Sequence, residues 1–217
     1  MPEIVLMSDP AVTSIPVREN GEALRDLRAG SGIRLDSRLA DAEGAYAHLR
    51  AGVIDRLLQA QARLPAGLQL LVVEGYRPLS VQTAYFQRYC ATLRRDHPDW
   101  SEDVVHREAS RSLSPPDIGP HVCGAAVDLT LCTASGAELP MGGAVNAAPE
   151  EDGGTCYTAA PGLPAEAARN RRILVDALSA TGLVNYPTEW WHWSYGDRYW
   201  AMTTRAPAAC YGLLPAV

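Results

Sequence analysis

The stretch Ala125-Ala-Val-Asp-Leu-Thr-Leu131 predicts a β-strand with one unusual side chain. Side chains alternate between the two faces of a strand, so Val127, Leu129 and Leu131 share one apolar face. Asp128 lies on the opposite face, between Ala and Thr. We therefore expect a strand that presents a lone carboxylate to one side.

Segments on both sides of this strand predict further elements. Residues 68–73 form a short apolar run that ends at Glu74-Gly75, which is typical of a buried strand. The last section, 183–202, is short-strand material rich in Trp and Tyr. Apolar residues at helical spacing predict helices over 46–64, 80–97, 101–112 and 164–181. One face of the second helix carries Val81, Tyr85, Tyr89 and Leu93. In the fourth helix we expect the inward residues to be Ala168, Ile173, Leu174 and Leu178.

The order of these elements predicts the fold class. Helices and strands interleave without the regular alternation of a parallel α/β sheet, so we expect an α+β protein. A chain of 217 residues with 47% hydrophobic content is long enough for one core. We expect one domain over 1–217, with a small, mostly antiparallel central sheet flanked by helices and an irregular segment over about 1–44. Residues 132–162 predict a long loop, and loops of that length are usually functional.

Composition and charge limit the classes of partner and the cellular compartment that we expect for this protein. The net charge is −6 and the Arg residues are scattered, which argues against a nucleic-acid surface. No apolar run approaches the length of a membrane span, and the N-terminus lacks a basic leader followed by an apolar stretch. Five cysteines without a C-x-x-C pair favour reduced thiols. We expect a cytoplasmic protein without a nucleic-acid or membrane partner, and the oligomeric state stays open.

Two short segments concentrate the side chains that can bind a metal ion. They are His121-Val-Cys-Gly-Ala-Ala-Val-Asp128 and Glu189-Trp-Trp-His192. A catalytic zinc takes three protein ligands of the His and carboxylate kind and keeps one position open for water. The segments offer two imidazoles and two carboxylates, one group more than ligation requires. The spare carboxylate is the proton shuttle that metal-assisted hydrolysis needs.

Spacing indicates where these side chains lie. His121 and Asp128 are seven residues apart, so one straight strand would place them on opposite faces. We therefore expect His121 in the loop before the strand, with Gly124 allowing the chain to turn back. By the same parity, Glu189 belongs at a loop edge and His192 on a strand.

Each segment also has a purely structural explanation. A lone His with an Asp seven residues later is more often a capping or surface pair, and only the joint occurrence of both segments favours a metal site. Cys123 could ligate a metal, but it is better explained as a small side chain packed beside the site. Three tryptophans are mainly core residues, with one ring available to line a pocket: Trp190, Trp191 and Trp193. The remaining histidines lie in polar contexts typical of a surface: His48, His97 and His106.

The two segments and several motifs around them resemble one family of zinc peptidases. This family, the M15 metallopeptidases, includes the D-alanyl-D-alanine dipeptidases of the vancomycin-resistance type, D,D-carboxypeptidases and the hedgehog signalling domain. The similarity extends over roughly residues 21–213. The matching motifs are Gly75-Tyr-Arg-Pro78, Asp128-Leu-Thr-Leu131, Pro140-Met-Gly142 and, as the most specific, Glu189-Trp-Trp-His-Trp-Ser-Tyr-Gly-Asp-Arg-Tyr-Trp200.

This resemblance implies a zinc site and a catalytic base. His121, Asp128 and His192 would bind one Zn²⁺ per chain. Glu189 would take a proton from the zinc-bound water and later return it to the leaving amine.

The resemblance also implies a role for Arg77, which would stabilise the oxyanion of the tetrahedral intermediate. A guanidinium stays charged and offers several donors, and Pro78 holds residue 77 extended. The alternative for Arg77 is a structural ion pair with Glu74 or another carboxylate.

The sequence departs from the family pattern at two positions that would bind the substrate. Gly119 replaces a Ser that commonly lies two residues before the metal-binding His, and Asn146 replaces an acidic residue that grips the free amine of the substrate. Asn keeps the size of that side chain but loses the charge that pairs with an ammonium group. An acidic residue of 150–152 could supply the charge instead. Together with Tyr76, Asn146 and Gly119 are the substrate-binding residues that we assign.

The resemblance therefore implies a zinc-dependent dipeptidase that cleaves D-alanyl-D-alanine, a peptidoglycan precursor, or a close analogue. One alternative is a D,D-carboxypeptidase that acts on a longer cell-wall peptide, although no export signal is recognisable. Another is a metal-binding protein that has lost hydrolysis. The presence of Glu189 argues against that loss, whereas Asn146 leaves room for it.

Overall fold

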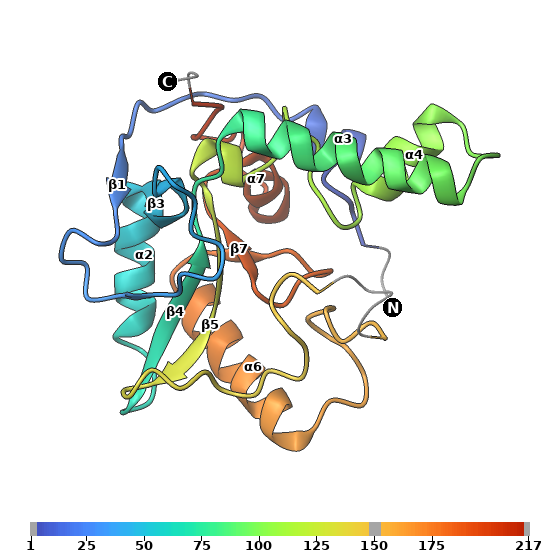
Figure 1. Cartoon of the computed structure of the whole chain (residues 1–217). Helices are drawn as coiled ribbons and strands as arrows, with labels where there is room; N and C mark the ends of the chain where they lie inside the picture. The colour runs from blue at the N-terminus through green and yellow to red at the C-terminus, as the bar shows by residue number, and fades with distance from the viewer. Residues whose placement is uncertain (1–3, 148–152, 215–217) are drawn as a thin grey trace.

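Five strands form the central sheet in the part of the chain that the computed structural model describes, residues 4–147 and 153–214 (Figure 1). Their order is β2-β4-β5-β7-β6, and only β2 runs parallel to its neighbour β4. The predicted α+β class with a mostly antiparallel sheet is therefore confirmed. The strands are β2 (Arg34–Leu35), β4 (Leu68–Glu74), β5 (Ala126–Thr133), β6 (Val184–Asn185) and β7 (His192–Ser194).

Helices lie behind this sheet and beyond its upper end in Figure 1, and a small second sheet lies beside it. In the second sheet, β1 (Leu24–Asp26) pairs antiparallel with β3 (His48–Arg50). The segment predicted to be irregular, about 1–44, holds only short elements where it is described. The described helices are α1 (Pro10–Thr13), α2 (Ala51–Gln61), α3 (Leu79–Asp96), α4 (Glu102–Ala109), α6 (Ala165–Ser179) and α7 (Arg198–Thr204), with 3-10 turns η1 (Ala45–Ala47) and η2 (His121–Cys123).

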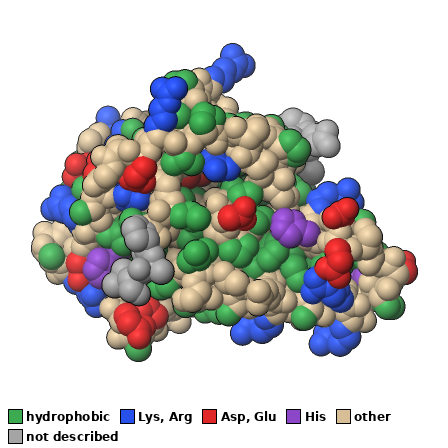
Figure 2. Space-filling view, turned by 90° about the horizontal axis from the view of Figure 1, so that it is seen from above, with side chains coloured by type: hydrophobic (Ala, Val, Ile, Leu, Met, Phe, Trp, Pro, Cys, Tyr) green, Lys and Arg blue, Asp and Glu red, His purple; other side chains and the backbone are tan. Residues whose placement is uncertain are grey.

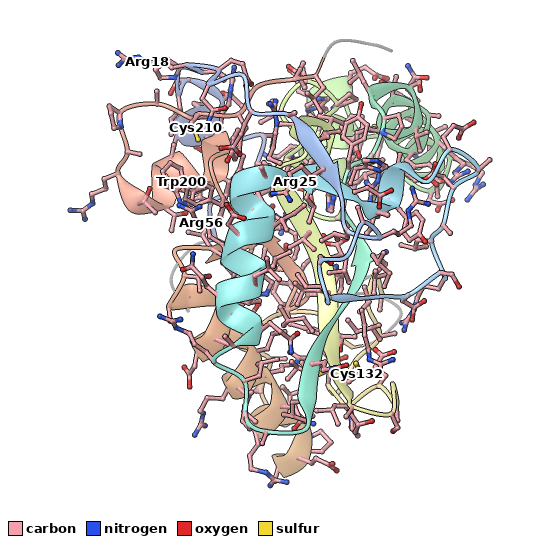
Figure 3. All side chains as sticks on the ribbon, turned by 90° about the vertical axis from the view of Figure 1, so that its left-hand side faces the viewer. Arg18, Arg25, Arg56, Cys132, Trp200 and Cys210 are labelled. Atoms are coloured by element: carbon pink, nitrogen blue, oxygen red, sulfur yellow. The ribbon has the colours of Figure 1, made fainter. Side chains whose placement is uncertain are left out.

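The main core lies between the sheet and the helices α2 and α6, which lie behind the sheet in Figure 1. Val127, Leu129 and Leu131 of β5 are fully buried in it, as their alternation predicted. Figure 3 shows α2 alongside the strands, with the labelled Arg56 on the same side as Trp200 of α7. The Arg56 guanidinium lies 3.3 Å from the centre of the Tyr195 ring, which in turn contacts Trp200.

Two predicted boundaries were wrong. The helix expected from residue 46 begins only at Ala51, because 48–50 extends along β1 as β3 and the buried Arg50 guanidinium pairs with Glu19 at 3.0 Å. The section 183–202, predicted as strand material, ends in α7. The carboxylate of Asp197 accepts hydrogen bonds from two backbone N–H groups of the first turn and so starts this helix.

The apolar faces read from helical spacing agree only in part with the residues that are buried in α3 and α6. In α3 the buried residues are Gln82, Phe86 and Cys90, whereas Tyr85 is 40% exposed and its predicted companions are half-buried. The reason is that α3 packs against α4 rather than on the sheet, which buries a neighbouring stripe. In α6, Leu174 and Leu178 are buried as predicted, but Ala168 and Ile173 are half-buried.

The surface charges, the lengths of the helices and the state of the cysteines bear on the partners and the compartment of the protein. Figure 2 shows basic and acidic side chains interspersed over the face seen from above. Within the described residues, no helix combines the length and the apolar character needed to cross a membrane. The five cysteines are all free thiols, and four of them are buried.

Candidate metal centre

Three neighbouring strands bring charged side chains into one row. Asp128 of β5 is paired with His192 of β7 on one side and with Glu74 of β4 on the other. Residues paired across strands project to the same face, so these three side chains share the face opposite the apolar stripe of β5. A β-bulge between Val72 and Glu74 shifts the register of β4 by one residue and places Glu74 opposite Asp128.

His121 reaches this row from the turn before β5, as its spacing predicted. It begins η2, which ends at Gly124 in the left-handed conformation with φ 67°. A Cβ at Gly124 would lie 2.4 Å from the Leu24 side chain, so both the backbone and the space require glycine. Nδ1 of His121 lies 2.6 Å from the carbonyl oxygen of Gly75. Because a carbonyl only accepts, Nδ1 carries the proton and donates, and Nε2 of the neutral ring presents its lone pair to the row.

The three donor atoms form a nearly equilateral triangle. His121 Nε2 lies 3.2 Å from His192 Nδ1 and 3.3 Å from Asp128 Oδ1, and His192 Nδ1 lies 3.0 Å from the same oxygen. With bonds of about 2.0–2.1 Å, neighbouring ligands of a tetrahedral zinc lie about 3.3 Å apart. All three residues are buried, and two imidazoles with one carboxylate are a donor set that zinc accepts. The residues present therefore fit a zinc ion with one open position.

The electrostatics of the triangle favour a positive charge at its centre. Burial raises the pKa of Asp128, but the two neighbouring imidazoles lower it by more, so the carboxyl stays ionised. Burial lowers the pKa of His121, and the Asp128 carboxylate raises it above its ordinary value. The buried carboxylate thus holds a proton on an imidazole when no other cation is near, and a metal ion would take the place of that proton.

Glu189 lies beside the triangle without belonging to it. Its Oε2 is 3.7 Å from Nδ1 of His192, and its side chain is 19% exposed. Burial raises the pKa of Glu189 to about 7. The neighbouring His192 and Arg77 lower this pKa and the negative Asp128 raises it, but burial has the largest effect. The residue lies in the turn before β7, as predicted, where its backbone N–H donates to the carbonyl of Tyr186 at 2.9 Å.

These side chains line a cleft of about 790 Å³. Arg77, Asn146 and Trp191 line the same cleft, so the structure brings most of the predicted site residues together. Gly119 is buried and Tyr76 is half-buried, and neither is among the described residues that line the cleft. Their role in substrate binding stays a prediction. The three acidic residues considered as substitutes, Glu150, Glu151 and Asp152, lie outside the described residues.

The residues of one wall of the cleft are not among the site residues predicted from the sequence. It is formed by Tyr85, Arg88 and Tyr89 of α3, and the loop 38–41 forms another edge. The sequence places the two tyrosines on one face of a helix, and we assigned them no role in a site. Tyr combines an apolar ring with a polar tip, which suits the wall of a binding site as well as a core, and this is the signal that could have indicated it.

Arg77 forms the ion pair that was considered as its alternative role and still borders the cleft. Its Nε and Nη2 donate to the two carboxylate oxygens of Glu74 at 2.7 and 2.5 Å. Burial lowers the pKa of Arg77, but this pairing raises it by more, so the guanidinium stays charged. The ion pair does not exclude a catalytic role, because a guanidinium offers five N–H groups.

Cys123 packs beside the centre and is not part of the donor triangle. Its thiol donates to the carbonyl oxygen of Gly119 at 3.3 Å. Burial raises the pKa of the Cys123 thiol to about 12, which keeps it protonated. This agrees with the interpretation of Cys123 as a small packed side chain.

Gly75→Ala is expected to destabilise the protein by about 1–3 kcal/mol and to weaken metal binding, because overpacking displaces backbone. A Cβ at Gly75 would lie 2.5 Å from the carbonyl oxygen of His48, and Gly75 itself holds the ring of His121. Thermal unfolding and zinc titration of the purified variant measure both effects. Gly119→Ala is the matched control, since its nearest neighbours would be 3.4 Å away. Equal behaviour of the two variants would contradict the prediction.

The comparison with known proteins agrees with this site. A buried set of two imidazoles and a carboxylate, next to a further carboxylate in an open cleft, is the arrangement that metal-dependent hydrolases use. The family model described as D-ala-D-ala dipeptidase matches residues 38–208, and the chain therefore belongs to the M15 peptidase family. The resemblance found in the sequence and the prediction of a peptidase are confirmed.

Individual relatives of this chain are D-alanyl-D-alanine dipeptidases, as the description of the family model is. A D-alanyl-D-alanine dipeptidase of Synechocystis sp. is 30% identical over 188 residues, which cover 75% of this chain and 75% of that protein. A D-alanyl-D-alanine dipeptidase of Escherichia coli is 30% identical over 128 residues, 58% of this chain and 55% of that protein. Among solved structures, the LdcB LD-carboxypeptidase covers 87% of this chain and 75% of its own at 17% identity, with a TM-score of 0.49, which adds nothing to the family assignment.

Proposed function

We propose that this peptidase hydrolyses a small dipeptide, D-alanyl-D-alanine or a close analogue, with one Zn²⁺ held by His121, Asp128 and His192. The names of the relatives support the substrate class. The observation that carries the proposal is the triangle of donor atoms 3.0–3.3 Å apart, with the Glu189 carboxylate 3.7 Å from its His192 corner. When bound there, zinc would supply a Lewis acid that polarises the scissile carbonyl and lowers the pKa of water.

In this proposal Glu189 moves the proton. It takes a proton from the attacking water and passes it to the amine that leaves. A general acid–base group works best when its pKa lies near the working pH, and burial raises the pKa of Glu189 to about 7. The carboxylate borders the cleft, so it can reach both the water and the leaving nitrogen.

Arg77 stabilises the negative charge that develops on the carbonyl oxygen. It borders the same cleft as the donor triangle and keeps N–H groups beyond those that Glu74 occupies. Donors that are held in place at low exposure are effective at such a charge, because they need no reorganisation during the reaction.

The proposal is tested by incubating the zinc-loaded protein with D-Ala-D-Ala, its stereoisomers and other dipeptides, while the release of free amine is measured. We expect D-Ala-D-Ala or a close analogue to be cleaved, and a chelator to stop the cleavage. If zinc is bound and no dipeptide is cleaved, the proposal fails in favour of a metal-binding protein without hydrolysis.

Asn146→Asp is expected to lower KM for a dipeptide with a free amine by about tenfold, since a charge-assisted hydrogen bond contributes about 1.5 kcal/mol more than a neutral one. The residue borders the cleft with φ 65°, a conformation that Asn and Asp both tolerate, so the backbone should be kept. Steady-state kinetics on D-Ala-D-Ala measure the effect, and the N-acetylated dipeptide serves as the control substrate. An unchanged KM for the free amine would show that the amine is recognised elsewhere.

The size of the cleft favours one second candidate, a D,D-carboxypeptidase that removes the last residue of a longer peptide. The volume of about 790 Å³ lies in the upper part of the range of about 300–1,000 Å³ that small-molecule sites occupy, which leaves room for more than a dipeptide. A pentapeptide ending in D-Ala-D-Ala, compared with the free dipeptide at equal concentration, separates the two candidates by kcat/KM.

A further inference from the structure

The guanidinium of Arg77 is anchored on two sides by side chains outside the donor triangle. Glu74 accepts hydrogen bonds from Nε and Nη2, and Gln82 Oε1 accepts one from Nη1 at 2.7 Å. Three of the five N–H groups are therefore engaged by these two residues, which leaves one on Nη1 and one on Nη2. These two are adjacent nitrogens, so together they can serve a single oxygen or a pair of oxygens.

Gln82 is an unexpected residue in this position. It lies on α3 among apolar residues, is 2% exposed and begins the buried stripe that continues with Phe86 and Cys90. Its Nε2 donates to the carbonyl oxygen of Ser114 at 2.6 Å. A carbonyl cannot donate, so the amide must turn its nitrogen to Ser114 and its oxygen to Arg77. A buried amide is stable only when both ends are satisfied, and Gln82 meets this condition by joining Arg77 to the segment that leads to His121.

We propose that Gln82 is a positioning residue, which together with Glu74 holds the two remaining N–H groups of Arg77 toward the reacting carbonyl. The inference rests on the proposed function, in which Arg77 stabilises the oxyanion. Without Gln82 the Arg77–Glu74 pair would keep its two hydrogen bonds but could tilt as a unit. A small displacement of such a donor is costly, because its effect depends on its distance from the developing charge.

The first test is Gln82→Met, which keeps the length of the side chain and removes both hydrogen bonds. We expect kcat to fall about tenfold, as for the loss of one hydrogen bond to a charged group. KM for the dipeptide and the zinc content should stay unchanged, since the donor triangle is untouched. Gln87→Met is the matched control, because Gln87 lies exposed on the same helix. Full kcat in Gln82→Met would overturn the inference.

A double-mutant cycle shows whether Gln82 acts through Arg77. In an Arg77→Lys background, Gln82→Met should lower kcat by less than about twofold, because coupled residues are not additive. A phosphinate analogue of the tetrahedral intermediate should bind Gln82→Met about tenfold more weakly than the wild type, in line with a loss confined to the transition state. An equal loss of kcat in both backgrounds would contradict the inference. If Gln82→Met does not fold, the shorter Gln82→Asn takes its place in the same cycle.

Failure of this inference differs from failure of the proposed function. A zinc-loaded wild type that cleaves no peptide would overturn the proposed function and, with it, the role of Gln82. An active wild type that is matched by Gln82→Met would overturn the role of Gln82 alone.

Discussion

Glu189→Gln should bind zinc as the wild type does and lose turnover by about 10²–10⁴-fold, the range that a general acid–base group contributes. The amide keeps the size of the side chain but cannot take up a proton. The donor triangle does not include Glu189, so its three atoms remain in place. Zinc content by elemental analysis and kcat on a cleaved dipeptide measure the two effects separately.

The pH dependence of kcat/KM in the wild type should report the titration of Glu189. Glu189 acts as a base when deprotonated, so kcat/KM falls about tenfold per pH unit below its apparent pKa. Burial raises the pKa of Glu189 to about 7, and a bound dication lowers it, which places the acidic limb at or below pH 7. Glu166→Gln, a surface substitution on α6, is the control and should keep the full profile. Wild-type turnover in Glu189→Gln would show that the base is another residue.

His121→Ala should reduce the zinc content from about one ion per chain to a small fraction of it and abolish activity. The substitution removes one corner of the triangle and leaves two donors, whereas zinc at a catalytic site takes three from the protein. We expect the loss of affinity to exceed the 10–100-fold that outer-shell changes typically cost. Zinc titration against a competing chelator measures it.

The control for this variant is His97→Ala. His97 follows the last residue of α3, is exposed and stacks on Trp100 with a distance of 3.8 Å between the ring centres, and it does not belong to the donor triangle. Its replacement should change neither zinc affinity nor kcat. Full zinc occupancy in His121→Ala would remove His121 from the ligand set, whichever activity the variant shows.

Much of the site could be predicted from the chain because it depends on local rules. The alternation in 125–131 determined which face of β5 is apolar and left Asp128 on the other face. Parity placed His121 in the turn before this strand, and the left-handed Gly124 confirms the reason. Side-chain chemistry then limited the ions that two imidazoles and a carboxylate can hold.

Other features depend on partners distant in sequence, and for these the sequence was insufficient. Helix α2 begins at Ala51 and not at the predicted residue 46, because β3 pairs with β1 and Arg50 forms an ion pair with Glu19. The packing of α3 against α4 determines which stripe of α3 is buried, and it leaves Tyr85 in the wall of the cleft. The hydrogen bonds that hold the Arg77 guanidinium likewise come from two different elements, from Glu74 on β4 and from Gln82 on α3.

By itself, then, the sequence determined the class of the fold, the donor types and the faces of the strands, because periodicity and side-chain chemistry are properties of short segments. Only the tertiary structure decided which helix stripe was buried, which carboxylate faced Asp128 across the bulge and which amide held Arg77. These outcomes are contacts between segments, and the free energy that selects among them depends on the packing of the whole molecule rather than on any one stretch of it.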